Sequence, residues 1–261
     1  MKTFLVILLN LMLVAYLILG LSFSSQKEKE LLCNDIQIDM LDTLNSGFLT
    51  KTDIEEIILR EESEILGYPV ININTRNLEN RLRSFPYVKE AEAYYDMEGI
   101  LYVKISQRRP VMRILTGRGN SYYIDSEGYV FPPRGGFTPH ILVCNGYFTE
   151  GNEIRNIRNL SELKDDDRYK EWTDALELAL FIEKDKFWKA QLVQVYLNSK
   201  NEFEIIPRVG AHQIILGGTD MLEEKFGKLL ILYRDGFDYE GWNKYEKINL
   251  KYKNQVICTK R

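Results

Sequence analysis

The stretch VKEAEAYYDMEGILYVKISQ, residues 88–107, predicts a β-hairpin. Val88–Tyr95 is expected to form the first strand and Ile100–Gln107 the second, with Asp96-Met97-Glu98-Gly99 as the turn between them. Apolar residues recur at every second position of the returning strand, at Leu101, Val103 and Ile105. Because such residues share one face of a strand, the segment predicts two adjacent antiparallel strands with one apolar face.

The residues before the hairpin predict one strand and two helices. Asp35–Met40 alternates polar and apolar residues, which is typical of a half-buried strand. Thr50 and Asp53 have the spacing of a capping box and predict the start of a helix. The apolar face of this helix consists of Ile54, Ile57 and Ile58. A second helix is expected around Leu78 and ends before Pro86, so the order is strand, helix, helix, strand, strand.

The second half predicts another α+β domain, with a mostly antiparallel sheet. Arg109-Pro110 marks its start, because proline donates no hydrogen bond to a ladder and suits an edge or a joint. Tyr122–Asp125 and Tyr129–Phe131 flank a compact hairpin turn. Further strands are expected at 193–197, 203–205 and 214–216, with helices around Trp172 and from Asp220 and Glu223 onward.

An apolar run from Phe4 to Leu21, interrupted only by Asn10, predicts a single transmembrane helix. At about 1.5 Å per residue it would span roughly 27 Å, close to the thickness of a hydrocarbon core of about 30 Å. A cleaved signal peptide is the alternative, but the run is long for one and no A-x-A-like cleavage site follows it. Residues 1–26 are therefore expected to be a short tail and a membrane anchor, with the amino terminus in the cytoplasm and the bulk outside.

The composition indicates that the part of the chain outside the membrane is globular. The chain is 45% hydrophobic and 28% charged, with a net charge of −4, which excludes disorder over most of its length. Mild acidity gives no reason to expect nucleic acid as a partner. Cys33, Cys144 and Cys258 are far apart in the sequence and form no CxxC or Cys/His group. We therefore expect them to pack as small apolar residues in cores or strands, and we expect no metal site.

No pattern predicts a catalytic, cofactor-binding or metal site. His140 and His212 lie in loop or turn contexts, where exposed histidine is common. A G-x-S-x-G motif is absent, and Gly217-Gly218-Thr219-Asp220 lacks the lysine of a phosphate loop, so a turn and a helix cap are expected there. The acidic run Asp165–Asp167, in a polar connection from Asn152 to Lys170, lacks the alternating ligands of a calcium loop. The sequence therefore predicts a binding protein, not an enzyme.

Several segments resemble a POTRA domain, in the form found in the bacterial division family FtsQ/DivIB. The first of them are Phe85–Glu92, Gly99–Ile105 and Arg108-Arg109-Pro110. Tyr122–Pro132 is similar to the family's YYID-x-x-G-x-x-FP hairpin, and Ile248–Lys253 is similar to its last regular strand. The resemblance implies a POTRA domain (β-α-α-β-β) at 32–109 and, at 110–261, a β domain whose carboxy-terminal strand binds a partner.

The strand Ile248–Lys253 is therefore the candidate partner-binding site. An edge strand displays main-chain groups that another chain can pair with. The resemblance implies that this strand binds FtsB within the FtsQ–FtsB–FtsL complex, with Tyr252 as an anchor and Lys251 in place of an arginine that faces acidic partner residues. The candidate residues are Ile248, Leu250, Lys251, Tyr252 and Val256, the last in a tail where some members carry a tryptophan. Alternatively, Ile248, Leu250 and Tyr252 face the protein's own core.

The function implied by the resemblance is that of a non-enzymatic scaffold of the division machinery. It would lie in the inner (cytoplasmic) membrane at the division septum, face the periplasm and bind FtsB-like and FtsL-like proteins, thereby helping to control septal wall synthesis. Strand edges of the POTRA domain offer a further surface for other division proteins. Two alternatives are a POTRA-type translocation component, which normally carries several such domains and a β-barrel, and a membrane-tethered cell-envelope hydrolase.

Overall fold

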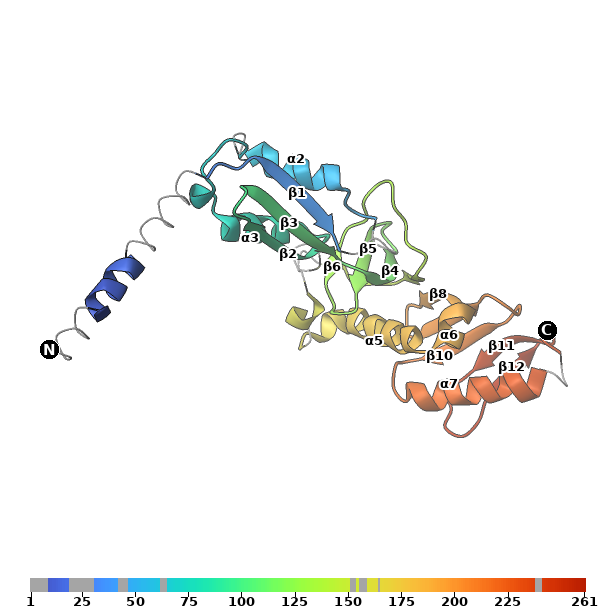
Figure 1. Ribbon diagram of the computed structural model, residues 1–261. Helices are drawn as coiled ribbons and strands as arrows, with labels where there is room; N and C mark the ends of the chain where they lie inside the picture. Colours follow the sequence, from blue (N-terminus) through green and yellow to red (C-terminus); the bar gives the residue numbers. More distant parts are fainter. Residues whose placement is uncertain are drawn as a thin grey trace. The chain divides into compact units, whose positions relative to one another are not determined.

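The computed structural model contains two compact units, residues 1–108 and 109–261 (Figure 1). The residues that it describes are 9–18, 31–41, 47–61, 65–150, 154, 159–163, 165–237 and 241–261. Residues 9–18 are helical, whereas the rest of the predicted span lies outside the described residues. Within the described part, no helix is long and apolar enough to cross a membrane, so the predicted transmembrane helix is not found there.

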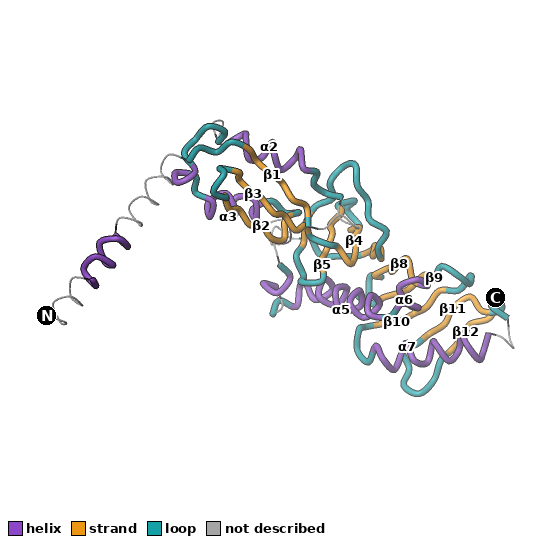
Figure 2. Tube along the Cα trace, in the orientation of Figure 1, coloured by secondary structure: helices purple, strands orange, loops and turns teal. Residues whose placement is uncertain are grey.

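The first unit contains a three-stranded sheet in the order β1-β3-β2 (Figure 2). β2 (Val88–Tyr95) and β3 (Ile100–Gln107) form the predicted antiparallel hairpin, with Ala93 opposite Val103. β1 (Asp35–Met40) pairs parallel to β3 on its other side, with Ile38 opposite Val103. The three strands predicted for this half are therefore confirmed.

Two helices bury their apolar faces against this sheet. α2 (Lys51–Glu61) begins at the predicted capping box: the Thr50 N–H donates to Asp53 Oδ2 at 2.7 Å, and the Asp53 N–H donates to Thr50 Oγ1 at 3.2 Å. α3 (Thr75–Ser84) is capped by Asn74 and follows a short 3-10 helix, η1 (Val70–Asn72). The shared core includes Ile54, Ile58, Leu78, Leu82, Ala91, Leu101, Val103 and Ile105. The predicted order of strand, helix, helix, strand, strand is confirmed.

The second unit is built on one nine-stranded sheet in the order β12-β11-β10-β9-β8-β7-β4-β5-β6. Its strands are β4 (Pro110–Thr116), β5 (Ser121–Asp125), β6 (Val130–Phe131), β7 (Leu142–Gly146), β8 (Leu192–Leu197), β9 (Phe203–Pro207), β10 (Gln213–Gly217), β11 (Tyr245–Asn249) and β12 (Ile257–Lys260). Five of the eight neighbouring pairs are antiparallel. The other three, β10 with β11, β7 with β8 and β4 with β7, are parallel, so the sheet is mixed. The predicted α+β class is confirmed.

The first strand of this sheet corrects one expectation. Pro110 was expected at an edge or a joint, but it is the buried first residue of β4, which lies between β7 and β5. The register shifts between Pro110 and Met112, so the ladder is irregular where the proline N–H is missing. The joint interpretation therefore holds, and the edge interpretation is wrong.

Three helices of the second unit pack their buried sides into one core with the strands. They are α5 (Lys170–Lys184), α6 (Lys186–Gln191) and α7 (Leu222–Ile231), which continues into a π-helical turn, η4 (Leu232–Gly236). Two 3-10 turns, η2 (Leu160–Leu163) and η3 (Asp167–Tyr169), lie in the described part of the predicted polar connection. The core that the helices share with the strands includes Trp172, Leu178, Trp188, Val195, Ile205, Ile214, Phe226, Leu229 and Ile248.

The start of α7 differs from the predicted cap. Met221, with φ of +50°, precedes the helix, and no side chain caps it. The Asp220 carboxylate instead lies 3.1 Å from Lys225 Nζ, which also donates to the Gly218 carbonyl at 2.9 Å. Only 4% of the Lys225 side chain is exposed, and a buried ammonium needs such partners. Asp220 therefore neutralises Lys225 and does not cap the helix.

Candidate partner-binding site

The predicted binding strand is not an edge of the sheet. β11 lies between β10, to which it is parallel, and β12, to which it is antiparallel. The regular strand also ends at Asn249, so Lys251 and Tyr252 belong to the turn that leads to β12. The expectation of an open row of main-chain groups along Ile248–Lys253 is therefore wrong. β12 occupies that position and is itself the outermost strand of the described sheet.

The apolar candidates divide into buried and exposed side chains. Ile248 and Leu250 are 0% and 1% exposed and belong to the core of the second unit, so the core-facing alternative holds for both. Val256 is half-buried against the same core. Tyr252, in contrast, is 45% exposed. Of the predicted apolar contacts, Tyr252 alone thus presents a large exposed surface.

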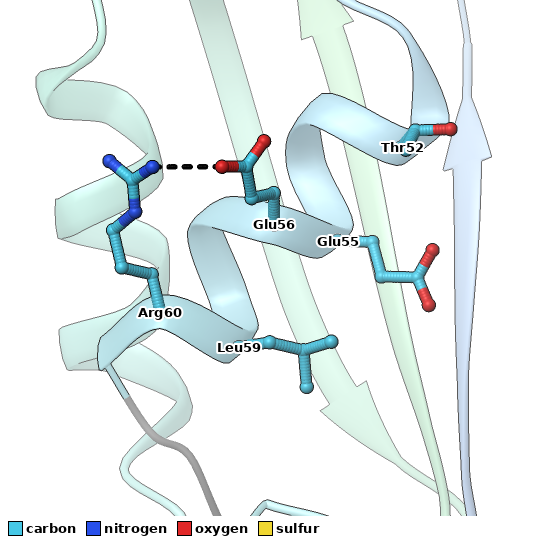
Figure 3. Close-up of a pocket in the computed structure, with 5 residues that line it drawn as sticks. All are labelled: Thr52, Glu55, Glu56, Leu59 and Arg60. Carbon is cyan, nitrogen blue, oxygen red and sulfur yellow. Dashed lines mark hydrogen bonds and ion pairs between the residues drawn. The ribbon is translucent and has the colours of Figure 1, made fainter.

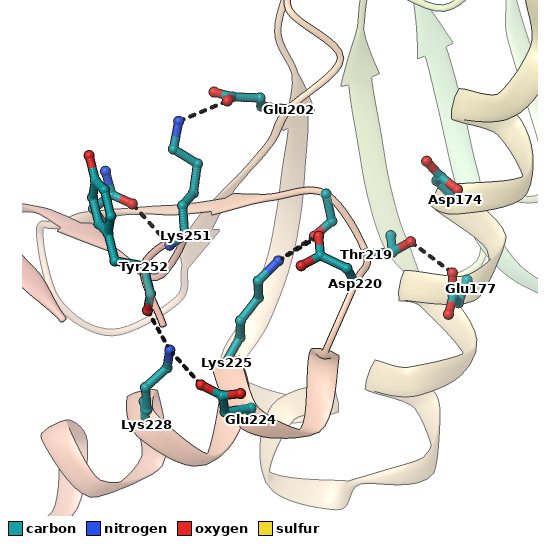
Figure 4. Close-up of polar contacts among 12 residues, drawn as sticks. Asp174, Glu177, Glu202, Thr219, Asp220, Glu224, Lys225, Lys228, Lys251 and Tyr252 are labelled. Atoms are coloured by element: carbon teal, nitrogen blue, oxygen red, sulfur yellow. Dashed lines mark hydrogen bonds and ion pairs between the residues drawn. The ribbon is translucent and has the colours of Figure 1, made fainter. Parts of the chain in front are cut away.

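The polar contacts around Tyr252 connect the turn to its neighbours (Figure 4). Lys228 of α7 donates to the Tyr252 carbonyl oxygen at 2.9 Å and lies 3.3 Å from the Glu224 carboxylate. Lys251 Nζ lies 2.8 Å from Glu202 Oε1, in the turn between β8 and β9. These contacts fix the main chain at Tyr252 while its ring remains exposed.

The Lys251–Glu202 pair has two structural consequences. The hydrogen bond from Lys251 lowers the pKa of Glu202, and the same bond raises the pKa of Lys251, so both groups stay charged at neutral pH. Gly217 lies beneath the lysine stem with φ of +78°, and a Cβ there would stand 2.9 Å from Lys251 Cγ and Cδ. A glycine is thus needed for Lys251 to cross the end of β10.

The main-chain groups of β12 alternate between the sheet and solvent. The Leu250 N–H donates to the Ile215 carbonyl of β10, so the groups of Asn249 and Lys247 point the other way, toward β12. Their register partners Ile257 and Thr259 close this ladder, and the Arg261 N–H continues it by donating to the Lys244 carbonyl. The intervening amides, those of Cys258 and Lys260, consequently point outward from the sheet.

The free edge has an apolar and basic character. Ile257 is 44% exposed, Cys258 packs partly against the core, and Thr259 and Lys260 are exposed. Arg261 follows directly and donates from its guanidinium to the Ala211 carbonyl. The edge therefore combines two outward amides with an exposed isoleucine and positive charge, which suits an extended acidic segment.

Sequence reasoning missed β12 because the strand is short and lacks a clear alternation. Its signal is the pair of β-branched residues Ile257 and Thr259, two positions apart, after a turn at Asn254. Asn254 has φ of +60°, a conformation that asparagine adopts more readily than most residues. This turn reverses the chain and brings β12 back along β11.

The groups considered for catalysis are dispersed over the described chain. No cluster of three or more His, Cys, Asp or Glu side chains there is arranged to hold a metal ion. His140 is exposed as expected, but His212 is only 3% exposed, so the expectation of an exposed loop histidine is wrong for it. Cys33 and Cys144 are buried free thiols, and burial raises the pKa of the Cys144 thiol.

Comparison with known families adds two matches to this geometry. Residues 31–106 match the model of a POTRA-like domain. Residues 109–259 match the model described as FtsQ/DivIB, C-terminal related, which covers the whole sheet from β4 to β11 and most of β12. No curated protein matches the chain. Since the second match alone covers more than half of the sequence, the chain belongs to the FtsQ/DivIB family.

Proposed function

We propose that this protein is a membrane-anchored, non-enzymatic scaffold of the bacterial divisome, and that β12 receives a strand from an FtsB-like partner. Family membership supports the general part, because the FtsQ/DivIB domains suggest a division scaffold and the family is in general non-enzymatic. The observation that carries the specific part is the outer position of β12, with the amides of Cys258 and Lys260 directed away from the sheet.

The proposed complex places a partner strand beside β12 and the ring of Tyr252 against the partner. Main-chain hydrogen bonds would supply affinity, and the exposed side chains near the edge would supply selectivity. An FtsL-like protein would join through the FtsB-like partner. Residues 4–21 would anchor the chain in the inner membrane with its bulk in the periplasm, at the division septum, where the assembly helps to control septal wall synthesis.

Replacing Lys260 by proline tests the strand addition. Lys260→Pro removes one outward N–H at the end of an exposed edge, a place where proline leaves the internal ladder intact. The control Lys260→Thr removes the same charge but keeps the amide. With the full chain and an FtsB-like partner, we expect Lys260→Pro to raise Kd at least about tenfold relative to Lys260→Thr, measured by titration calorimetry.

A second variant distinguishes the contribution of the Tyr252 ring to partner binding from that of strand pairing at β12. Tyr252→Ala is expected to weaken the same complex by about 2 kcal/mol, since exposed aromatic anchors are frequent hot spots, and to leave the thermal midpoint nearly unchanged. Equal affinities for Lys260→Pro and Lys260→Thr would exclude pairing at β12. If only Tyr252→Ala weakened binding, the partner would dock by side-chain contacts alone.

A further inference from the structure

The POTRA-like unit has one edge closed by its own helix. Glu79 of α3 accepts the Ala93 N–H of β2 at 2.9 Å, and Arg83 donates to the Ala91 carbonyl at 2.6 Å. Arg83 and Glu79 lie 3.1 Å apart and hold each other in place. These two side chains occupy the outward main-chain groups in the middle of β2, so a foreign strand would have to displace them.

The opposite edge, β1, has no such cover in the described part of the chain. β3 is its one neighbour in the sheet. The Leu41 N–H donates to the Ile105 carbonyl of β3, so the alternation of a parallel ladder pairs the main-chain groups of Gln37 and Asp39 with β3 and directs those of Ile38 and Met40 away from it. Cys33 points to the same side and exchanges two bonds with Gly67 and Tyr68, so this loop closes only the start of the edge.

The side chains of β1 give the open edge a distinct chemistry. Asp35, Gln37 and Asp39 are exposed on the face away from the helices. Ile36 and Met40 lie on the other face, half-buried against the core. A strand added here would therefore meet carboxylates on one face and apolar groups on the other.

Helix α2 extends the apolar side of this edge. It contacts β1 and carries an open depression of about 500 Å³ lined by Thr52, Glu55, Glu56, Leu59 and Arg60. Figure 3 shows Glu55 and Leu59 projecting on the side of α2 nearer to β1, whereas Glu56 and Arg60 pair with each other on the other side. Leu59 is 37% exposed, so the depression adds both an apolar contact and a carboxylate.

We propose that β1 is a second docking edge, which accepts an extended segment of another protein with alternating basic and apolar residues. The basic side chains of this segment would face Asp35 and Asp39, and its apolar side chains would pack against Ile36, Met40 and Leu59. A second copy of β1 is a poor occupant, because pairing would set these aspartates against their own kind. The charge is opposite to that of β12, so the two edges select different segments.

A short synthetic peptide that alternates lysine and valine is the probe for this edge. We expect the full chain to bind it and to bind a glutamate–valine peptide at least about tenfold more weakly, as measured by fluorescence anisotropy. Met40→Pro should abolish binding, because it removes an outward N–H at the end of β1, whereas the control Met40→Leu keeps the N–H and should bind normally. Lys260→Pro should leave this binding unchanged, which separates the outcome from that of the divisome complex.

Hydrogen exchange keeps the proposal testable if Met40→Pro does not fold. On the unmodified chain, the lysine–valine peptide should slow exchange at Ile38 and Met40 and leave Ala91 and Ala93 unaffected. Asp35→Asn with Asp39→Asn should weaken binding. Unchanged exchange at Ile38 and Met40, equal binding by Met40→Pro and Met40→Leu, or a homodimer that Met40→Pro disrupts would each overturn the proposal.

Discussion

Acidification from pH 6.5 to pH 4 is expected to remove about 3 kcal/mol of stability through His212 alone. Burial, and to a smaller extent the positive charge of Arg261, together lower the pKa of this histidine from 6.5 to about 4. The unfolded chain takes up the proton near pH 6.5, whereas the folded chain takes it up only near pH 4. The stabilisation is therefore complete above pH 6.5 and is lost progressively as the pH falls to about 4.

The surroundings of His212 explain why its neutral form is favoured. Nε2 lies 2.7 Å from the Tyr233 hydroxyl, whereas Nδ1 is buried and has no hydrogen-bond partner in the described residues. The rings of Tyr233, Phe237 and Trp242 pack around the imidazole at centroid distances of 5.5, 5.3 and 6.4 Å. An imidazolium here would carry one N–H without an acceptor in apolar surroundings.

Denaturant titrations at pH 7 and pH 4.5 measure this effect. His212→Gln should lose stability at pH 7 because of the altered packing, but should show a shallower dependence on pH. The control His140→Gln changes an exposed histidine and should retain the pH dependence of the unmodified protein. Equal pH dependence for His212→Gln and the unmodified protein would contradict the assignment.

Truncation of Trp172 is expected to cost about 3–5 kcal/mol, the largest loss for one side chain in the second unit. Trp172 lies on α5 and is 0% exposed, and its Nε1 donates to the Thr149 carbonyl at 3.0 Å. Its ring meets Tyr122 and Phe148 edge-on at centroid distances of 5.5 and 5.3 Å. Trp172→Ala therefore leaves a cavity, breaks two aromatic contacts and removes the donor to the Thr149 carbonyl.

Thermal and denaturant unfolding of Trp172→Ala would measure the loss directly. Trp172→Phe keeps most of the ring volume and should cost less. Phe187→Ala is the matched control, since this aromatic side chain, near the start of α6, is 45% exposed and should cost less than about 1 kcal/mol. A loss for Trp172→Ala no larger than that for Phe187→Ala would show that the core does not depend on this side chain.

The elements that the sequence predicts well are those encoded by neighbouring residues. The hairpin at 88–107 depends on alternation and a turn, and the start of α2 depends on Thr50 and Asp53, three residues apart. β7 was missed because its five residues, LVCNG, show little alternation and pair on both sides with strands distant in sequence. Such a strand is stabilised by its neighbours more than by its own pattern.

The candidate site illustrates the same limit. The sequence identifies Tyr252 and Lys251 as notable residues, but it cannot show that β12 folds back over β11 and takes the outer position. Burial of His212 is equally non-local, since Tyr233, Phe237 and Trp242 surround it from later in the chain. The residues just before it, Gly210 and Ala211, do not indicate that aromatic rings surround the histidine.

The parallel pairing of β10 with β11 has a consequence for the maturation of the protein. Parallel neighbours require a crossover, and here the chain passes through α7 before β11 can align and β12 can follow. Contacts of this kind close large loops and form late in folding. The edge proposed to receive the partner would therefore be present only on molecules that have completed their fold, and a partner strand that requires it would not bind immature copies.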